Sequence, residues 1–328
     1  MFKKSKPLAL KSSASMICNN LTVLNNADRG SLNYASVHKY LINMVSTSTD
    51  GSQVTHKQVI CKEPSASQQS SSMIMQTKWV HLGNGRTILV LTSLKGIQMF
   101  EYDGSSMIYW HATCDASTDS NETSNFGRGI AAASESLVCV GTQQGAVLVF
   151  DVPVKGTNVS VTATCQGHTS AICDLASEGD VLVSADEDGN IIIWKTSGSS
   201  VQQTVKIPGN GDPCTSRYFW KGIIVAAFGN GQLCLYTTAG KLASTVNAHA
   251  RWINAIDIAK ESGMVVSVSE DSYARVWQLI PGNPPIIEFK FAEAVTDQQL
   301  VGAQFVHPAG RGFVVSGYDS SDLNFFVQ

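Results

Sequence analysis

The sequence predicts an all-β chain built from repeated units of four short strands, and three observations indicate this. Charged residues make up only 15% of the chain, fewer than long solvent-exposed helices usually carry. Two segments, residues 183–194 and 266–277, share one residue pattern. Aromatic residues close six segments of this shape at spacings of 41 to 50 residues. A repeat at a fixed period indicates the architecture before any single element does.

The two best-matched segments define the unit. Each reads as an apolar strand, a tight acidic turn, a second apolar strand and a terminal Trp. In both, Ser stands four residues before Asp, and Asp stands six before Trp. A His precedes that Asp by 20 residues in one copy and by 22 in the other. The matched positions are His168, Ser184, Asp188 and Trp194 in one copy and His249, Ser267, Asp271 and Trp277 in the other.

Weaker copies of this pattern cover the rest of the chain. In them, short apolar runs are separated by Gly, Asn, Asp or Ser, which is the pattern of short strands joined by turns. The first unit shows strand-like runs at 21–24, 32–37 and 40–45, and the second ends at residue 100. The third covers 139–150, the fifth 225–236 and the seventh 315–326. In the fourth we expect strands at 172–176, 181–185, 190–195 and 202–207. The closing aromatics are Phe100, Phe150, Trp194, Tyr236, Trp277 and Phe326.

Seven units of four strands at this period are typical of a β-propeller. We therefore predict one domain over residues 1–328, a seven-bladed β-propeller of four-stranded antiparallel blades. The last unit ends two residues after Phe326 and lacks a fourth strand, whereas residues 6–12 have no partner in the first unit. We expect this N-terminal strand to complete the last blade and close the ring. Pro7 and the nearby lysines suit such an edge strand.

The motif that runs from Gly167-His168 to Trp194, and again from Ala248-His249 to Trp277, resembles the WD-repeat family. The dipeptide that names the family is altered, because Lys195 and Gln278 follow the two tryptophans. Six short segments resemble one particular member of that family: 18–21, 96–99, 109–112, 229–232, 247–251 and 316–319.

The resemblance implies a role for each matched quartet. It implies a structural hydrogen-bond relay from Asp through His and Ser to the Trp N–H, although His, Ser and Asp could also suggest a catalytic triad. Such a relay satisfies polar groups that burial would otherwise leave unpaired. The resemblance also implies a rim where partners dock, next to the relay His and the turn Asp. By position, the candidate rim residues are Arg251, Trp252, Asn254, Glu187 and Glu270.

Charge and composition argue against several functional classes. The net charge of −3 offers no overall positive field for nucleic acid, and the apolar runs are too short for membrane insertion. The eight cysteines are scattered without a C-x-x-C pair, so we expect reduced thiols, no zinc and a cytoplasmic location. Gly-Asn-Gly turns at 83–85, 209–211 and 229–231 do not continue as phosphate-binding loops. We expect no cofactor.

We therefore expect a non-enzymatic interaction platform, a scaffold or adaptor, for protein or peptide partners. One alternative is a propeller enzyme with ligands in a central channel, for which Asp174 is suited but Gly127 and Ser216, at the corresponding places, are not. Another is a ubiquitin-ligase substrate receptor, which often shows Trp-Asp-x-Arg after the third strand; this chain lacks it there. Polar loops at 64–72 and 115–125 are either solvated excursions or partner-binding segments. The partner and any homo-oligomer remain open.

Overall fold

The structure is a computed structural model that describes residues 2–26, 29–49, 51–62, 71–113 and 125–328. These residues form 29 β-strands and, within the described ranges, no α-helix. The strands make seven antiparallel sheets, which are the blades of a seven-bladed β-propeller. The fold class predicted from the repeat is therefore confirmed. The two polar loops predicted at 64–72 and 115–125 lie almost entirely outside the described residues.

The chain divides into two compact units. The first contains Met1–His38, Ile42–Val59 and Thr215–Gln328, and therefore holds blades 5, 6, 7 and 1. Blade 5 consists of β19 (Cys214–Trp220), β20 (Ile223–Phe228), β21 (Gln232–Thr237) and β22 (Leu242–Asn247). Blade 6 consists of β23 (Ile253–Ala259), β24 (Met264–Ser269), β25 (Tyr273–Ile280) and β26 (Ile286–Ala294). Blade 7 contains β27 (Leu300–Phe305), β28 (Gly312–Gly317) and β29 (Asp322–Val327). Blade 1 consists of β3 (Thr22–Asn26), β4 (Ser31–His38), β5 (Leu41–Ser48) and β6 (Val54–Ile60).

The second unit contains Lys39–Leu41 and Ile60–Cys214 and holds blades 2, 3 and 4. Blade 2 consists of β7 (Ile74–His81), β8 (Thr87–Ser93), β9 (Gly96–Glu101) and β10 (Met107–Ala112). Blade 3 consists of β11 (Gly127–Ala133), β12 (Leu137–Thr142), β13 (Ala146–Asp151) and β14 (Ser160–Gln166). Blade 4 consists of β15 (Ile172–Glu178), β16 (Val181–Asp186), β17 (Ile191–Ser197) and β18 (Ser200–Ile207). The four strands predicted for this blade are each within two residues of those observed.

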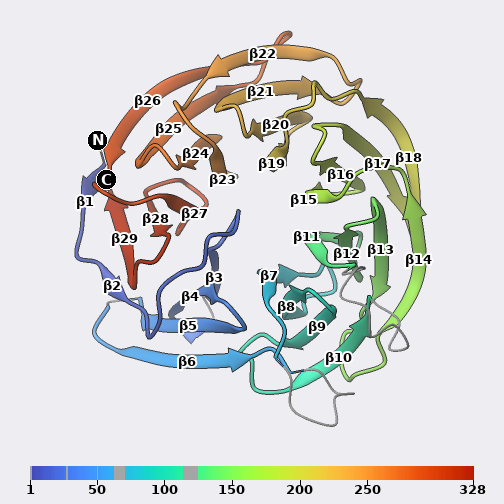
Figure 1. Ribbon diagram of the computed structural model, residues 1–328, viewed down its shortest axis with the longest axis horizontal. Helices are drawn as coiled ribbons and strands as arrows, with labels where there is room; N and C mark the ends of the chain where they lie inside the picture. The colour runs from blue at the N-terminus through green and yellow to red at the C-terminus, as the bar shows by residue number, and fades with distance from the viewer. Residues whose placement is uncertain (1, 27–28, 50, 63–70, 114–124) are drawn as a thin grey trace. The chain divides into compact units, whose positions relative to one another are not determined.

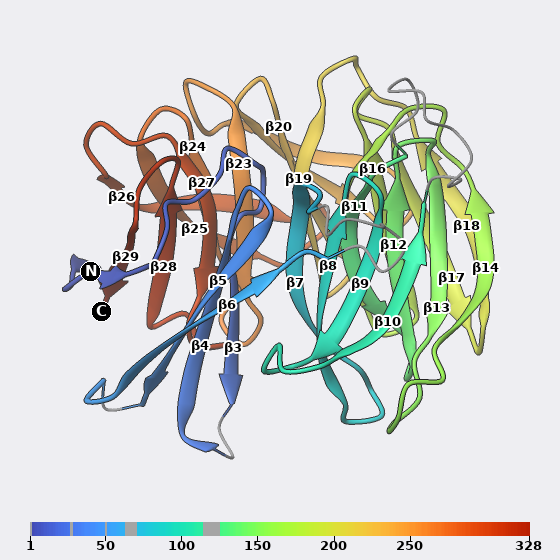
Figure 2. The same cartoon turned by 60° about the horizontal axis from the view of Figure 1, so that its bottom comes forward.

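The N-terminal segment completes the last blade, as predicted. It does so as two short strands, β1 (Lys3–Lys4) and β2 (Leu8–Ala9), which both pair antiparallel with β29. Figure 1 and Figure 2 show the two chain ends beside each other at this sheet. The expected single strand over 6–12 is thus wrong in its bounds, because Pro7 has no N–H to donate and falls between the two strands. The Ser5 N–H still bonds to the Phe325 carbonyl at 2.8 Å.

The cores lie between neighbouring blades of each unit. Alternate side chains of each strand point to opposite faces of its sheet, so neighbouring blades of one unit pack face to face. Between blades 6 and 7, the buried Phe2 meets Phe313 with ring centroids 5.0 Å apart and anchors β1. Five of the six closing aromatics are buried; Tyr236 is partly exposed.

In blades 2, 3, 5 and 6 one exposed apolar side chain of the outer strand occupies a recurring position. It pairs with the closing aromatic of the third strand, as Phe289 does with Trp277, where the ring centroids are 5.6 Å apart. Leu242 stands in the same register opposite Tyr236. A β-bulge follows this position in blades 3 to 6. These side chains shield the closing aromatic, and the bulges discourage further strand pairing.

Candidate functional site

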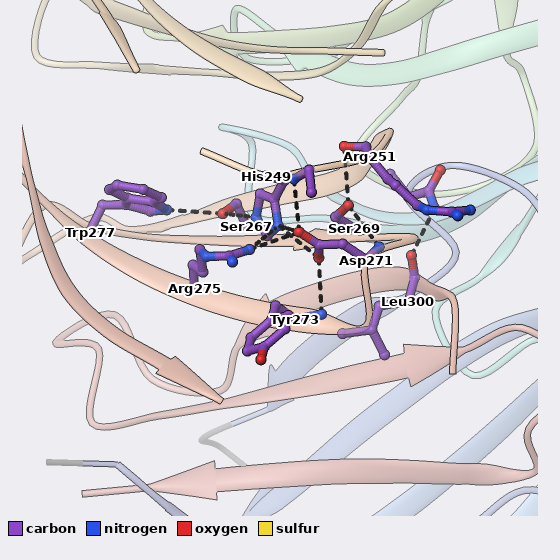
Figure 3. Close-up of polar contacts among 11 residues, drawn as sticks. His249, Arg251, Ser267, Ser269, Asp271, Tyr273, Arg275, Trp277 and Leu300 are labelled. Atoms are coloured by element: carbon purple, nitrogen blue, oxygen red, sulfur yellow. Dashed lines mark hydrogen bonds and ion pairs between the residues drawn. The ribbon is translucent and has the colours of Figure 1, made fainter. Parts of the chain in front are cut away.

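The second predicted quartet is connected by hydrogen bonds in the expected order (Figure 3). His249 precedes β23, Ser267 lies in β24, Asp271 lies in the turn after β24, and Trp277 lies in β25. The His249 Nδ1 lies 3.0 Å from Asp271 Oδ1, and its Nε2 lies 2.7 Å from Ser267 Oγ. The Trp277 Nε1–H donates to Ser267 Oγ at 2.9 Å.

The proton positions follow from the two ends of this chain. An indole N–H can only donate and an ionised carboxylate can only accept, so Ser267 Oγ accepts from Trp277 and His249 Nδ1 carries the hydrogen that faces Asp271. In a neutral ring, Nε2 then accepts the hydrogen of the Ser267 hydroxyl. Each polar atom along the chain has a partner, which is what a buried network requires.

Charge around this quartet favours the neutral imidazole. Burial lowers the pKa of His249, and the neighbouring Arg275 guanidinium lowers it further, against the opposing effect of Asp271. Burial alone would raise the pKa of Asp271, but hydrogen bonds from His249, the Ala250 N–H and Arg275 outweigh it and hold that pKa far below its ordinary value. Arg275 Nη1 donates to Asp271 Oδ2 at 2.9 Å. The carboxylate is therefore fully ionised.

The first predicted quartet needs one correction. His168 Nε2 lies 2.6 Å from Ser184 Oγ, and Trp194 Nε1 donates to the same oxygen at 2.8 Å, as expected. The carboxylate that faces His168 Nδ1, however, belongs to Asp186, whose Oδ2 lies 2.8 Å from that nitrogen. The assignment to Asp188 was therefore wrong. Asp188 is exposed and accepts from the Ser170 hydroxyl instead.

The register of the strands explains why Asp186 takes the place that was predicted for Asp188. Asp186 pairs with Ile172 just as Ser269 pairs with Ile253, so Asp186 occupies a place at the end of the strand where the other copy has a serine. From there its carboxylate reaches the imidazole and also accepts the N–H of Asn190 at 2.8 Å. Burial would raise the pKa of Asp186, but hydrogen bonds from His168 and Asn190 outweigh it and lower that pKa.

Both quartets are closed to solvent. The side chains of His168, Asp186 and His249 are 0% exposed. Ser184 and Ser267, which would be the nucleophiles of a triad, are also 0% exposed. A substrate could reach neither hydroxyl without opening the blade, so the arrangement holds strands together and offers no access for chemistry.

Of the predicted rim residues in blade 6, three reach the surface. Arg251 is exposed, while Trp252 and Glu270 are partly exposed. Their main chain is fixed, since Ser269 Oγ donates to the Arg251 carbonyl at 3.2 Å and the Glu270 N–H donates to the Trp252 carbonyl at 3.1 Å. The Trp252 ring rests on Gly229, where an added Cβ would lie 2.8 Å from the ring.

Asn254 does not belong to that rim. It is 3% exposed and sits at the β-bulge of β23, where the extra residue re-aims its side chain toward blade 7. Its Nδ2 donates to the Leu300 carbonyl at 2.8 Å, so it joins two blades and is not a surface contact. In the second unit, Glu187 is exposed and forms an ion pair with Arg128 at 3.8 Å.

Sequence reasoning missed a polar junction formed by Asn19 and Asn20. Figure 1 shows the chain running from β2 to β3 through this segment. The Asn19 N–H donates to the Asn254 carbonyl at 2.9 Å, and the Asn20 N–H donates to the Val301 carbonyl at 2.9 Å. The Asn20 side chain accepts the Val37 N–H at 2.7 Å. Blades 6, 7 and 1 are joined here, and the Asn-Asn pair before an apolar run was the available signal.

The described residues contain no group of three or more His, Cys, Asp or Glu side chains placed to hold a metal ion. They also form no helix that could span a membrane. None of the seven cysteines within the described ranges forms a disulfide. Burial raises the pKa of Cys139 to about 12, so this thiol is inert.

Comparison with known proteins places the chain in a family. A family model described as WDR54 matches residues 1–328. WD repeat-containing protein 54 of Mus musculus is 39% identical over 334 residues, covering 98% of both chains. The Homo sapiens protein of the same name is 39% identical over 338 residues, covering 99% of both. The chain belongs to the WD repeat-containing protein 54 family. The six short segments had indicated this same protein, and that prediction is confirmed.

Solved structures similar to this chain share its fold at low sequence identity. A chain of "Crystal Structure of Mitotic Checkpoint Complex" aligns with a TM-score of 0.75 at 15% identity, covering 99% of this chain and 95% of its own. "Crystal structure of RRP9 WD40 repeats" aligns with a TM-score of 0.73 at 13% identity, covering 99% of both. Like these, the WD repeat-containing protein 54 family has a WD-repeat propeller, a fold that typically serves as a protein-interaction scaffold.

Proposed function

We propose that this chain is a non-enzymatic interaction platform that binds protein or peptide partners through the rim of blade 6. The observation that carries the proposal is the contrast between the two kinds of polar site. The two quartets are sealed in the blades, whereas Arg251, Trp252 and Glu270 present side chains to solvent. A rigid scaffold with buried networks and an outward-facing rim is suited to binding.

The rim of blade 6 has the features of a binding hot spot. Arg and Trp contribute large contact areas and directed donors, and they are enriched among residues that dominate binding energy. The hydrogen bonds that fix the Arg251 and Trp252 carbonyls hold this corner in one conformation, which reduces the entropy lost on binding. Glu187, in the second unit, is a separate candidate of the same kind.

A charge exchange at the rim tests this function. In Arg251→Glu/Glu270→Arg the net charge is unchanged, and the relay and the Trp252 ring are left intact. The matched control exchanges the exposed pair Lys195 and Asp180, whose charged atoms lie 4.0 Å apart, as Lys195→Asp/Asp180→Lys. Proteins cross-linked to each variant in cell extract would be quantified against the unmodified chain.

We expect specific partners to be lost from the rim variant and kept by the control. If both variants retain the same proteins in the same amounts, this rim is not the binding surface. We further propose that residues 1–328 act as a single domain, which the match of the family model to the whole chain supports. A cytoplasmic location is proposed as well, and it is supported by the described cysteines, none of which forms a disulfide.

A further inference from the structure

A row of basic side chains follows three turns of the first unit that lie far from the blade 6 rim. These turns join the first and second strands of blades 5, 6 and 7, at residues 221–222, 260–263 and 306–311. Hydrogen bonds connect them in sequence. Trp220 Nε1 donates to the Lys260 carbonyl at 2.8 Å, and the Glu261 N–H donates to the Pro308 carbonyl at 2.9 Å. The three turns therefore form one continuous edge.

Lys221, Lys260 and Arg311 are the cations of this edge, and all three are exposed. The Lys221 ammonium lies 4.7 Å from the Trp220 ring centroid, which holds it at its turn. Lys260 and Arg311 accept hydrogen bonds with their main-chain carbonyls. The hydrogen bonds that shape the edge therefore do not depend on these two side chains. The acid of these turns is Glu261, which is also exposed.

The hairpin turns at the two ends of the strands of these blades differ in charge, although Arg251 of the blade 6 rim is a cation at the other end. At their opposite ends, the turns between the second and third strands carry Glu270, Asp271 and Asp319 and no Lys or Arg. The whole chain has a net charge of −3, so the positive sign of the edge is local. A surface with this local sign attracts anionic partners and is screened by salt.

We propose that this basic edge, defined by Lys221, Lys260 and Arg311, binds an acidic segment of a partner protein. Glu261, next to Lys260, would repel a uniformly anionic lipid surface or nucleic-acid backbone, whereas a peptide can place an uncharged residue opposite it. Two exposed apolar side chains, Ile280 and Ile286, pair across the hairpin beside the same turn. The hairpin is tied to that turn by the Leu279 N–H, which donates to the Gly263 carbonyl at 2.9 Å. The edge therefore suits an acidic segment that also carries apolar residues.

The test is a titration of the full chain into a fluorescein-labelled peptide of mixed Glu and Leu, followed by fluorescence anisotropy. A peptide with Gln in place of Glu serves as the uncharged probe, and phosphatidylcholine vesicles containing phosphatidylserine serve as the lipid probe. The variant Lys260→Glu/Arg311→Glu is compared with Lys6→Glu/Lys11→Glu, an equal charge change at exposed lysines away from the edge. A third variant, Glu261→Gln, removes the acid of the edge.

We expect the acidic peptide to bind in a salt-sensitive manner and the Gln peptide to bind more weakly. The Lys260/Arg311 variant should lose about tenfold or more in affinity, the Lys6/Lys11 variant less than about threefold, and Glu261→Gln should bind more tightly. Equal losses in both double variants, unchanged affinity in Glu261→Gln, or binding to vesicles but not to the acidic peptide would overturn the proposal. If the Lys260/Arg311 variant does not fold, Glu261→Gln decides the matter alone. None of these variants changes the blade 6 rim. A failure of the basic-edge proposal can therefore be distinguished from a failure of the proposal that the blade 6 rim binds partners.

Discussion

Removing the Ser267 hydroxyl would test the relay in blade 6 directly. The hydroxyl accepts the Trp277 N–H at 2.9 Å and donates to His249 Nε2 at 2.7 Å, and Ser267 is 0% exposed. Ser267→Ala therefore leaves one donor and one acceptor buried without a partner. Each such group costs about 1–3 kcal/mol, so the free energy of unfolding should fall by roughly 2–6 kcal/mol.

Equilibrium urea unfolding followed by circular dichroism measures this loss. A double-mutant cycle with Trp277→Phe separates the two orphaned groups. In the Trp277→Phe background there is no indole N–H that could lose its partner, so Ser267→Ala should cost about 1–3 kcal/mol less than in the natural chain. Ser200→Ala, at an exposed serine of β18, is the matched control and should change stability by less than about 0.5 kcal/mol. A loss below about 1 kcal/mol, or equal losses in both backgrounds, would refute the reasoning.

Three further outcomes follow from the same contacts. Asp186→Asn should lower the melting temperature clearly, because it disturbs the buried pair with His168, whereas Asp188→Asn should barely change it; equal effects would contradict the corrected assignment. Phe2→Ala should cost about 2–4 kcal/mol in urea unfolding by emptying the pocket between blades 6 and 7, and a loss near zero would show that β1 is not anchored there. Because the folded state lowers the pKa of His249 below 6.5, the unfolded chain binds the extra proton, and stability is lost as the pH falls below about 6.5. Arg275→Met should raise that pKa and shrink the loss of melting temperature between neutral pH and pH of about 5.5, and an unchanged pH profile would count against the charge argument.

Much of the fold could be predicted because the repeat is a local property. A strand, a two-residue turn and a second strand are specified by neighbouring residues, so the four strands of blade 4 are found within two residues of their expected bounds. The blade 6 relay was predictable for the same reason, since Ser267, Asp271 and Trp277 all lie on one hairpin. Its distant member, His249, was located by comparing the two copies.

The sequence by itself determined the sevenfold repeat, the strand order within blades and the joining of the two chain ends in one sheet. Tertiary structure alone decided the partners of Asp186 and Asn254. Asp186 replaces Asp188 because it ends a strand beside the imidazole, and Asn254 is buried because a bulge turns it toward the next blade. The basic edge likewise arises when hydrogen bonds bring together turns that are about 40 residues apart in the chain. Hairpin pairing depends on adjacent residues, whereas contacts between blades depend on packing of distant ones, and no single segment encodes them.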